Sequence, residues 1–321
     1  MKRSWRVLSA GAALGLVVVA LIRLLALTFS PLFVLIIAVT PLLLLGSWLV
    51  ILAGVLTRSR LLLGAGVALA LLQVFWMLGE FGRSPTRIDA VEDAPAGTAL
   101  RVATANVLAG NDAVGVLFES LVANGADVVM LQEITPAELD LLARTASWGD
   151  FPHRILDARP GAHGSVIVSR FAIDEGGVIW PGGWPMTRAV VRTAAGPVEF
   201  INVHVIAPLS PENLEIWAAQ LADLRTQVAG AAAPVIIAGD FNATAQHAGV
   251  RAIVGEGVAD AHLQAGWGWG ATFPAEATVP ALLRLDRILV SESLDVAGFE
   301  RLAPFGSDHH PLLAEVHLPG A

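Results

Sequence analysis

The sequence contains no cysteine and no tyrosine, and only 15% of its 321 residues are charged. The absence of cysteine excludes a disulfide scaffold, a zinc site built on thiolates and catalysis by a thiol. Soluble domains contain about 25% charged residues, so the low charge also argues against a disordered chain or a protein that coats nucleic acids. What the sequence has in excess is apolar residues, which make up 55% of the chain.

Acidic residues are missing from the first 79 positions. All 28 Asp and Glu lie at or after Glu80, whereas six of the 20 Lys and Arg precede it. Residues 1–79 therefore carry a net charge of +6, and residues 80–321 carry a net charge of −14. This division predicts a membrane anchor over residues 1–80, a linker over 81–99 and a soluble domain over 100–318.

Three long apolar runs occupy the predicted anchor, at residues 7–27, 31–56 and 61–79. A helix needs about 20 apolar residues to span a bilayer, so the runs predict three transmembrane helices. The first run could instead be a cleaved signal peptide, because basic residues precede it. It lacks a small-x-small cleavage site and two further runs follow, which favours an uncleaved anchor in a multi-pass protein of the cell membrane.

The basic residues predict the orientation of the anchor. Lys2, Arg3 and Arg6 precede the first run, and Arg58 and Arg60 lie between the second and third runs. These two flanks lie on the same side, which the positive-inside rule assigns to the cytoplasm. The N-terminus is therefore predicted to be cytoplasmic, and the soluble domain extracytoplasmic.

The soluble domain is rich in predicted strands. Segments with β-branched and apolar residues lie at 101–107, 126–133, 164–170, 188–193, 198–205, 234–242, 283–291 and 310–318. Helical patterns lie at residues 113–124 and 212–228. Strands dominate and crossover helices are few, which favours two packed sheets with flanking helices over a doubly wound parallel sheet.

Polar side chains follow several of these strands, and catalytic groups gather where strand ends open into loops. Each residue alone could be a turn or cap residue, but their number in one domain indicates a site. The strand-end residues are Asn106, Glu133, Asp240, Asn242, Asp308 and His309.

Two residues inside strands also have the chemistry of a site. The two-residue period of a strand places His204 on one face with Phe200 and Asn202. There it could donate to a phosphate oxygen or be a buried core histidine. Asp286 could pair with a neighbouring arginine, or it could accept from a histidine ring and fix its tautomer.

The segments TANV, MLQE, GSVIVSR, NVH, GDFNAT, RLDRIL and SDHHP occur in this order. Together they resemble the endonuclease/exonuclease/phosphatase superfamily, which includes DNase I-like nucleases, inositol polyphosphate 5-phosphatases and neutral sphingomyelinases. The resemblance covers residues 100–318 and would make the protein a membrane-anchored bacterial-type member. It implies a four-layer α/β sandwich, in which helices flank two central mixed β-sheets, and metal-dependent hydrolysis of phosphoester bonds.

The resemblance also implies a metal site. Asn106, Glu133 and Asp308 match positions of the family's metal site and its conserved SDH motif. The cofactor implied is Mg²⁺, with Mn²⁺ as an alternative, and oxygen ligands suit such hard cations better than zinc. His310 falls on a variable position of the motif and is assigned no role.

Catalytic roles follow from the same motifs. His204 matches a residue that contacts the phosphate, while Asp240 and Asn242 match the pair that positions water and stabilises the transition state. Asp286 matches the aspartate that orients the catalytic histidine, His309. Either Asp240 or His309 could accept the proton of water, and the ordinary pKa of histidine favours His309.

The substrate is less well defined by the sequence. The soluble domain has no lysine and a net charge of −14, which argues against stable binding of nucleic acid. A tethered extracytoplasmic domain meets lipid head groups at high effective concentration. Trp180, Trp184, Trp267 and Trp269 lie in two apolar loops that could meet the membrane interface or pack beneath the loops.

These observations predict a metal-dependent phosphoesterase that acts on lipid-linked or small phosphate esters, with a lipid head group favoured. A nuclease for extracellular DNA or RNA and a non-catalytic binding module remain as alternatives. A Ser/His/Asp hydrolase is disfavoured because the sequence contains no G-x-S-x-G motif. No oligomeric state is predicted.

Overall fold

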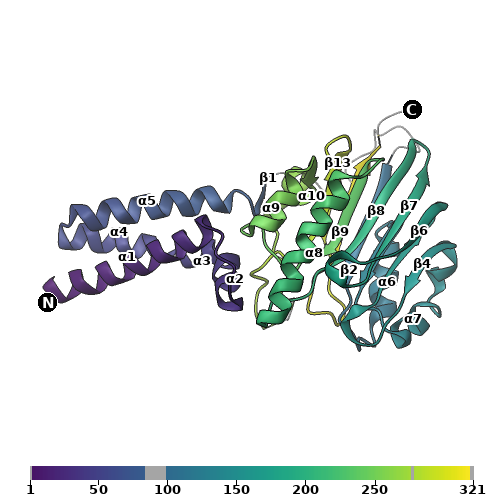
Figure 1. The fold of residues 1–321 in the computed structure, drawn as a ribbon, viewed down its shortest axis with the longest axis horizontal. Coiled ribbons are helices and arrows are strands. Elements are labelled where there is room, and N and C mark those ends of the chain that lie inside the picture. Colours follow the sequence, from purple (N-terminus) through teal and green to yellow (C-terminus); the bar gives the residue numbers. More distant parts are fainter. Residues whose placement is uncertain (1, 84–98, 276–277, 319–321) are drawn as a thin grey trace.

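The computed structural model describes residues 2–83, 99–275 and 278–318. It consists of a helical bundle joined at one end to a larger α/β domain (Figure 1). The N-terminal helices are α1 (Lys2–Leu24), α2 (Pro31–Ala38), α3 (Thr40–Leu43), α4 (Gly46–Thr57) and α5 (Arg60–Met77).

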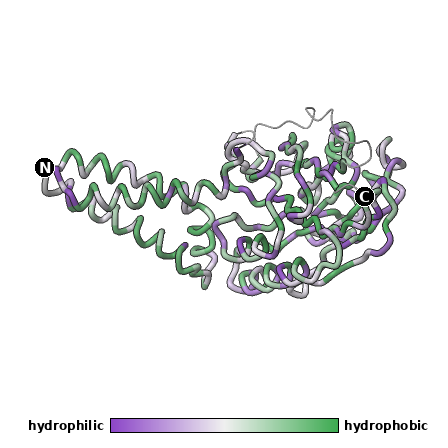
Figure 2. Tube along the Cα trace, turned by 90° about the horizontal axis from the view of Figure 1, so that it is seen from above, coloured by the Kyte–Doolittle hydropathy of each residue, from purple (hydrophilic) through white to green (hydrophobic). Residues whose placement is uncertain are grey.

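Three helical segments in the described residues are long and apolar enough to cross a membrane: Trp5–Leu24, Thr40–Thr57 and Arg60–Met77. Figure 2 shows apolar residues along the whole bundle, whereas the α/β domain mixes apolar and polar residues. Arg6 near the start of α1 donates to the carbonyl oxygen of Thr57. The N-terminal end of α1 and the α4–α5 turn therefore lie at the same end of the bundle, as the charge pattern predicts.

The second apolar run does not form a single helix. α2 ends at Ala38, and Pro41 lies in the first turn of α3. Proline has no backbone N–H, and its ring clashes with the carbonyl group four residues before it, so a helix that contains α2 cannot continue unbroken through Pro41. Figure 1 shows α2 lying crosswise at the end of the bundle that adjoins the α/β domain. The helix predicted over residues 31–56 is therefore shorter than expected: within that run only the segment Thr40–Thr57, which contains α3 and α4, is long and apolar enough to cross a membrane.

Two six-stranded sheets form the centre of the α/β domain. The first sheet has the order β13 (Asp295–Arg301), β14 (Leu312–His317), β2 (Ala99–Asn106), β3 (Val128–Gln132), β5 (Ser165–Ser169) and β4 (His153–Asp157). The second has the order β10 (Val258–Asp260), β12 (Asp286–Ser291), β9 (Val235–Asp240), β8 (Gly196–His204), β7 (Met186–Thr193) and β6 (Ile173–Ile179). The pairs β2–β3 and β8–β9 are parallel and the other pairs antiparallel, so both sheets are mixed.

Three apolar cores separate four layers. One core lies between the sheets and combines residues such as Met130 and Ile167 of the first sheet with Phe200 of the second. The second sheet packs on its outer face against α8 (Pro211–Ala229) and α9 (Ala248–Val254). The first sheet packs against α6 (Val114–Ala123) and α7 (Pro136–Leu142). The predicted α/β architecture of two mixed sheets flanked by helices is confirmed.

The junction between the bundle and the α/β domain is structured. β1 (Phe81–Arg83) pairs antiparallel with β11 (Trp267–Trp269), which follows the short helix α10 (Ala261–Ala265). The segment assigned to a linker over 81–99 therefore begins with a strand, and β2 begins at its last residue, Ala99. The rest of that segment, residues 84–98, lies outside the described residues.

Candidate functional site

Strand register in the second sheet aligns three of the predicted site residues. His204 ends β8 opposite Asp240 in the parallel strand β9, and Asp286 begins the antiparallel strand β12 opposite Asp240. All three side chains are consequently held at the same edge of the sheet. The Nε2 atom of His204 lies 4.0 Å from Oδ2 of Asp240.

The first sheet brings two more residues to this edge. β2 ends at Asn106 and the parallel strand β3 ends at Gln132, directly before Glu133. The Nδ2 atom of Asn106 donates to Oε1 of Glu133 at 2.9 Å and to Oδ2 of Asp240 at 3.2 Å. This buried amide therefore joins the strand ends of the two sheets.

The backbone is unusual at two of the predicted site residues. Glu133 has a φ of 62° and Asn242 a φ of 44°, a left-handed region that few non-glycine residues adopt. Such conformations persist where surrounding contacts over-determine them, and they cluster at functional sites. The N–H of Ala109 donates to Oε2 of Glu133 at 3.1 Å, and the N–H of Asn242 donates to Oδ1 of Asp240 at 2.8 Å. These bonds hold both carboxylates in place.

Glycine is required in the GDFN segment. Gly239 has a φ of 138°, and a Cβ atom added there would lie 2.0 Å from the carbonyl oxygen of Val203. The strands β8 and β9 can approach closely only because this side chain is absent.

His309 and Asp286 form a short hydrogen bond, with 2.7 Å between Nδ1 and Oδ2. Nε2 of His309 lies 3.8 Å from Oδ2 of Asp240, and the ring packs against that of Phe273. Burial lowers the pKa of His309, but the carboxylates of Asp286 and Asp240 outweigh it and raise that pKa to about 10. Burial raises the pKa of Asp240, an effect that His309 opposes. At neutral pH His309 is thus protonated.

These residues border a cavity of about 670 Å³. Six of the eight predicted site residues line it: Glu133, His204, Asp240, Asn242, Asp308 and His309. Asn106 and Asp286 are buried behind them. Among the described residues that line the cavity, none is a lysine or an arginine. The structure therefore brings the predicted residues together around one acidic cavity.

The donor set of this cavity suits a hard divalent cation. The side chains of Asp240, Asp286 and His309 offer ligand atoms within 4.8 Å of one another, but His309 is protonated and bonded to Asp286. The oxygen atoms of Glu133, Asn106 and Asp308 provide the alternative ligands that Mg²⁺ and Mn²⁺ prefer. Glu133, whose conformation is strained and whose carboxylate faces the cavity, is the residue best placed for this role.

The sequence patterns give no role in the site to His163 or Trp184, although both line the cavity. His163 lies in a loop after β4, and its ring centroid is 4.4 Å from that of Trp184. Burial, followed by the charge of His204, lowers the pKa of His163. Among the tryptophans considered for a membrane interface, Trp184 thus lines the cavity, while Trp180 and Trp267 are exposed. His163 and Trp184 lie in loops, where no helical or strand periodicity in the sequence indicates which way a side chain points.

Comparison with known proteins agrees with this geometry. The family model described as the Endonuclease/Exonuclease/phosphatase family matches residues 103–309. The chain belongs to this family. The protein called "Uncharacterized protein YbhP" from Escherichia coli K12 is 30% identical over 229 residues, which cover 60% of this chain and 84% of that protein.

Solved structures of the family share the fold. A family protein from Bacteroides thetaiotaomicron has a TM-score of 0.60 at 19% identity, covering 70% of this chain and 100% of that one. The mannosyl-6-phosphatase of Bacteroides thetaiotaomicron VPI-5482 has a TM-score of 0.55 at 20% identity, covering 68% and 99%. Endonucleases, exonucleases and phosphatases all hydrolyse phosphoester bonds, and the family is generally dependent on divalent metals. Membership therefore supports hydrolase activity.

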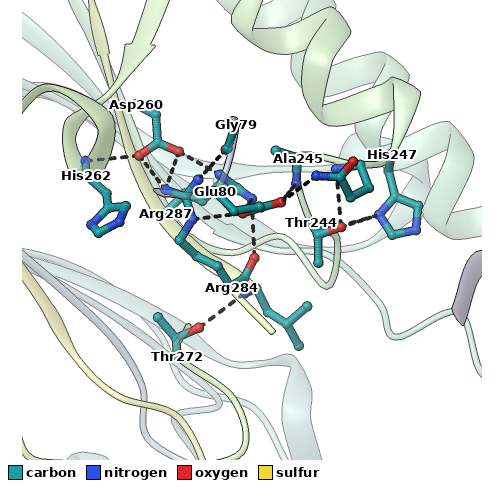
Figure 3. A network of polar contacts seen from close by, with 12 residues as sticks. Gly79, Glu80, Thr244, Ala245, His247, Asp260, His262, Thr272, Arg284 and Arg287 are labelled. Atoms are coloured by element: carbon teal, nitrogen blue, oxygen red, sulfur yellow. Dashed lines mark hydrogen bonds and ion pairs between the residues drawn. The ribbon is translucent and has the colours of Figure 1, made fainter. Parts of the chain in front are cut away.

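The family domain is fixed to the helical bundle by a buried charge network (Figure 3). Glu80, just after α5, accepts from Nε of Arg284 at 3.1 Å, and Arg284 donates twice to Asp260 at 2.8 and 2.9 Å. Arg287 donates to both carboxylates. Two carboxylates thus face two guanidinium groups, as buried charges require. Neither arginine bonds to Asp286, which excludes the alternative that Asp286 serves a surface ion pair.

A docking loop, residues 244–247, connects the GDFN segment, which contains Asp240 and Asn242, to the bundle. The N–H of Ala245 donates to Oε1 of Glu80 at 2.9 Å. Nδ1 of His247 accepts from the N–H of Thr244 at 3.0 Å, so its Nε2 carries the proton and donates to the carbonyl oxygen of Val34 in α2, also at 3.0 Å. His247 is thereby held neutral between Thr244 of the docking loop and Val34 of α2.

We expect the stability of this protein to fall on acidification through His247. Burial lowers the pKa of His247 from 6.5 to about 4. Above pH 6.5 the ring is neutral whether folded or unfolded, but between pH 6.5 and 4 only the unfolded chain binds the proton. The folded state loses stability as pH falls through this window, by about 3 kcal/mol at its lower end.

The apparent Tm of the full-length protein should therefore drop less between pH 7.5 and pH 5 after His247→Gln, which removes the titrating group. His262, whose pKa burial also lowers to about 4, is present in both proteins and cancels in the comparison. An equal drop in wild type and variant would contradict the assignment.

Proposed function

We propose that this protein is a membrane-anchored, extracytoplasmic phosphoesterase that uses Mg²⁺ or Mn²⁺ to hydrolyse lipid-linked or small phosphate esters. The observation that carries the proposal is the acidic cavity. Glu133, Asp240 and Asp308 line it, and no described lysine or arginine does. Three carboxylates against the single positive charge of His309 would repel a phosphate, so a bound divalent cation is needed to hold the substrate there.

Glu133, Asn106 and Asp308 would hold the metal ion, which supplies positive charge to a phosphoryl oxygen and to the leaving oxygen. Asp240 accepts the proton of the attacking water, since its pKa is raised by burial and a stronger base is a better acceptor. Asn242 positions this water.

His309 and His204 complete the site on the phosphate side. The protonated ring of His309 donates from Nε2 to a phosphoryl oxygen and stabilises charge in the transition state. His204 provides a second contact to the phosphate. Asp286 holds the ring of His309 in place. The role of proton acceptor, which the ordinary pKa of histidine favoured for His309, therefore passes to Asp240.

A nuclease is the competing function within the family. The catalytic domain contains no lysine and has a net charge of −14, whereas proteins that hold nucleic acid strands rely on Lys and Arg contacts to phosphates. The name of one structural relative, a mannosyl-6-phosphatase, supports a smaller phosphate ester. We therefore favour lipid-linked or small substrates over DNA and RNA.

Hydrolysis assays on the purified full-length protein test this proposal. Phospholipids, inositol phosphates, sugar phosphates, nucleotides and supercoiled plasmid are incubated with Mg²⁺, and the products are analysed. Hydrolysis of a lipid or small ester supports the proposal, and preferential nicking of plasmid supports the nuclease. Folded protein that hydrolyses none of them would leave only a binding module.

The orientation of the anchor can be tested separately. Alkaline phosphatase fused after Ala321 should be active and green fluorescent protein at the same position dark, because the Lys and Arg residues assign the opposite side to the cytoplasm. Active fluorescent protein together with inactive phosphatase would place the catalytic domain in the cytoplasm.

A further inference from the structure

Helix α2 belongs to the N-terminal segment of the chain but packs on the catalytic domain. The side chain of Val34 in α2 is 4% exposed, and Val34 belongs to the apolar core formed by α8, α9 and the second sheet. Its carbonyl oxygen is bound by His247, three residues beyond Thr244 in the docking loop that follows the catalytic GDFN segment. The position of α2 is therefore fixed relative to the catalytic residues.

The same helix forms one wall of the catalytic cavity. Leu32 and Leu35, which share a face of α2 because they are three residues apart, line the cavity and are 61% and 54% exposed. Leu209, in the segment 206–209 that also lines the cavity, is 82% exposed. Large side chains that are so exposed at the rim of a cavity indicate an apolar ligand or a membrane.

The place of α2 in the fold points to the bilayer surface. Figure 1 shows α2 crosswise at the end of the bundle that adjoins the catalytic domain. If α1, α4 and α5 cross the membrane along the bundle axis, α2 lies parallel to the membrane surface at one end of the bundle. One cavity then reaches from the membrane surface to Glu133, Asp240 and His309.

We infer that α2 and residues 206–209 bind the hydrocarbon chain of a membrane-resident phosphoester while its phosphate lies among the catalytic carboxylates. Leu32 and Leu35 are then residues that determine substrate preference. This inference rests on the proposed function and narrows it, because a small soluble ester would gain nothing from exposed leucines at the rim. The occupant is a lipid-linked phosphate, bound from the bilayer.

The test uses two diesters with the same leaving group, hexadecyl 4-nitrophenyl phosphate and ethyl 4-nitrophenyl phosphate, with full-length protein in lipid vesicles. Replacing both leucines (Leu32→Gln with Leu35→Gln) should lower kcat/KM for the hexadecyl ester about tenfold, the effect of losing roughly two methylene contacts. The ethyl ester should be affected much less, which also reports that the variant is folded.

The control variant is Leu156→Gln, at a side chain of β4 that is 46% exposed and does not line the cavity. It should leave the ratio of the two rates unchanged. Equal losses on both esters in the double variant, or no loss on either, would overturn the inference while leaving the phosphoesterase function intact.

A readout without turnover separates the two proposals. Hexadecyl phosphate carrying a diazirine at the chain end is photolysed with the wild-type protein in vesicles, and the labelled peptides are identified. We expect label on residues 206–209 and on α2, displaced by hexadecyl phosphate but not by hexadecanol. This result in a protein that hydrolyses neither of the two esters nor any compound of the hydrolysis assays would support the lipid site and contradict the phosphoesterase. Label confined to α1, α4 and α5 would overturn the inference.

Discussion

Glu133→Gln is expected to lower kcat about 100-fold or more, because it removes one negative charge from the proposed metal site in place. EDTA should abolish the activity of the wild type, and added Mg²⁺ or Mn²⁺ should restore it. The carboxylate of Glu133 lines the cavity and accepts from Asn106 and Ala109, so glutamine fills the same volume but is a weaker ligand. Activity is measured on the best substrate from the hydrolysis assays across a range of metal concentrations.

Glu138→Gln is the matched control for this prediction. Glu138 is 2% exposed and accepts from the N–H of Gly110, the residue next to Ala109, but it does not line the cavity. Both substitutions therefore weaken a hydrogen bond that holds the loop at Ala109 and Gly110. Only Glu133→Gln also alters the proposed metal site. Comparable activity losses in the two variants would mean that Glu133 acts through the loop, and full wild-type activity in EDTA would refute the metal site.

The central strands could be predicted from the sequence and the edge strands could not. The eight predicted strands all occur, and they include every interior strand of both sheets. The four missed strands of these sheets, β4, β6, β10 and β13, are their four edges. Interior strands are buried on both faces and read as continuous apolar runs, whereas edge strands carry charges and glycine that interrupt the pattern. β6, with the sequence IDEGGVI, illustrates the difference.

The candidate site could be predicted because its residues lie at strand ends. Asn106 ends β2, Glu133 follows the parallel strand β3, and Asp286 begins an antiparallel strand. All three residues therefore lie at the same ends of the strands, where the two sheets open into loops. The contacts between the α/β domain and the N-terminal helices have no comparable signal in the sequence. The bond from His247 to Val34 joins residues 213 positions apart, and nothing local in either segment indicates it. Pro41 is a local signal for the break after α2. The residues on both sides of it are apolar, however, so the hydropathy pattern does not show where one helix ends and the next begins.

The pairing of Asp286 with His309 predicts strongly non-additive losses of activity. The 2.7 Å bond from Nδ1 to Asp286 leaves Nε2 free to face the cavity, so in the proposed mechanism Asp286 is a positioning residue that acts through the ring. His309→Ala should be the most severe change, because it removes the donor itself. Asp286→Asn should lower kcat by about 10²–10⁴, by analogy with the loss of the correct tautomer in a serine-protease triad.

The double variant should be little worse than His309→Ala alone, since residues that act as one unit do not lose activity additively. His310→Ala serves as the control, because the ring of His310 bonds to the carbonyl oxygen of Leu302 and does not line the cavity.

A pH profile distinguishes positioning from a general loss of structure. The carboxylate of Asp286 raises the pKa of His309, so in Asp286→Asn the ring should lose its proton, and the enzyme its remaining activity, at a lower pH than in the wild type. Losses that multiply in the double variant, together with an unshifted alkaline limb, would show that the two residues act independently.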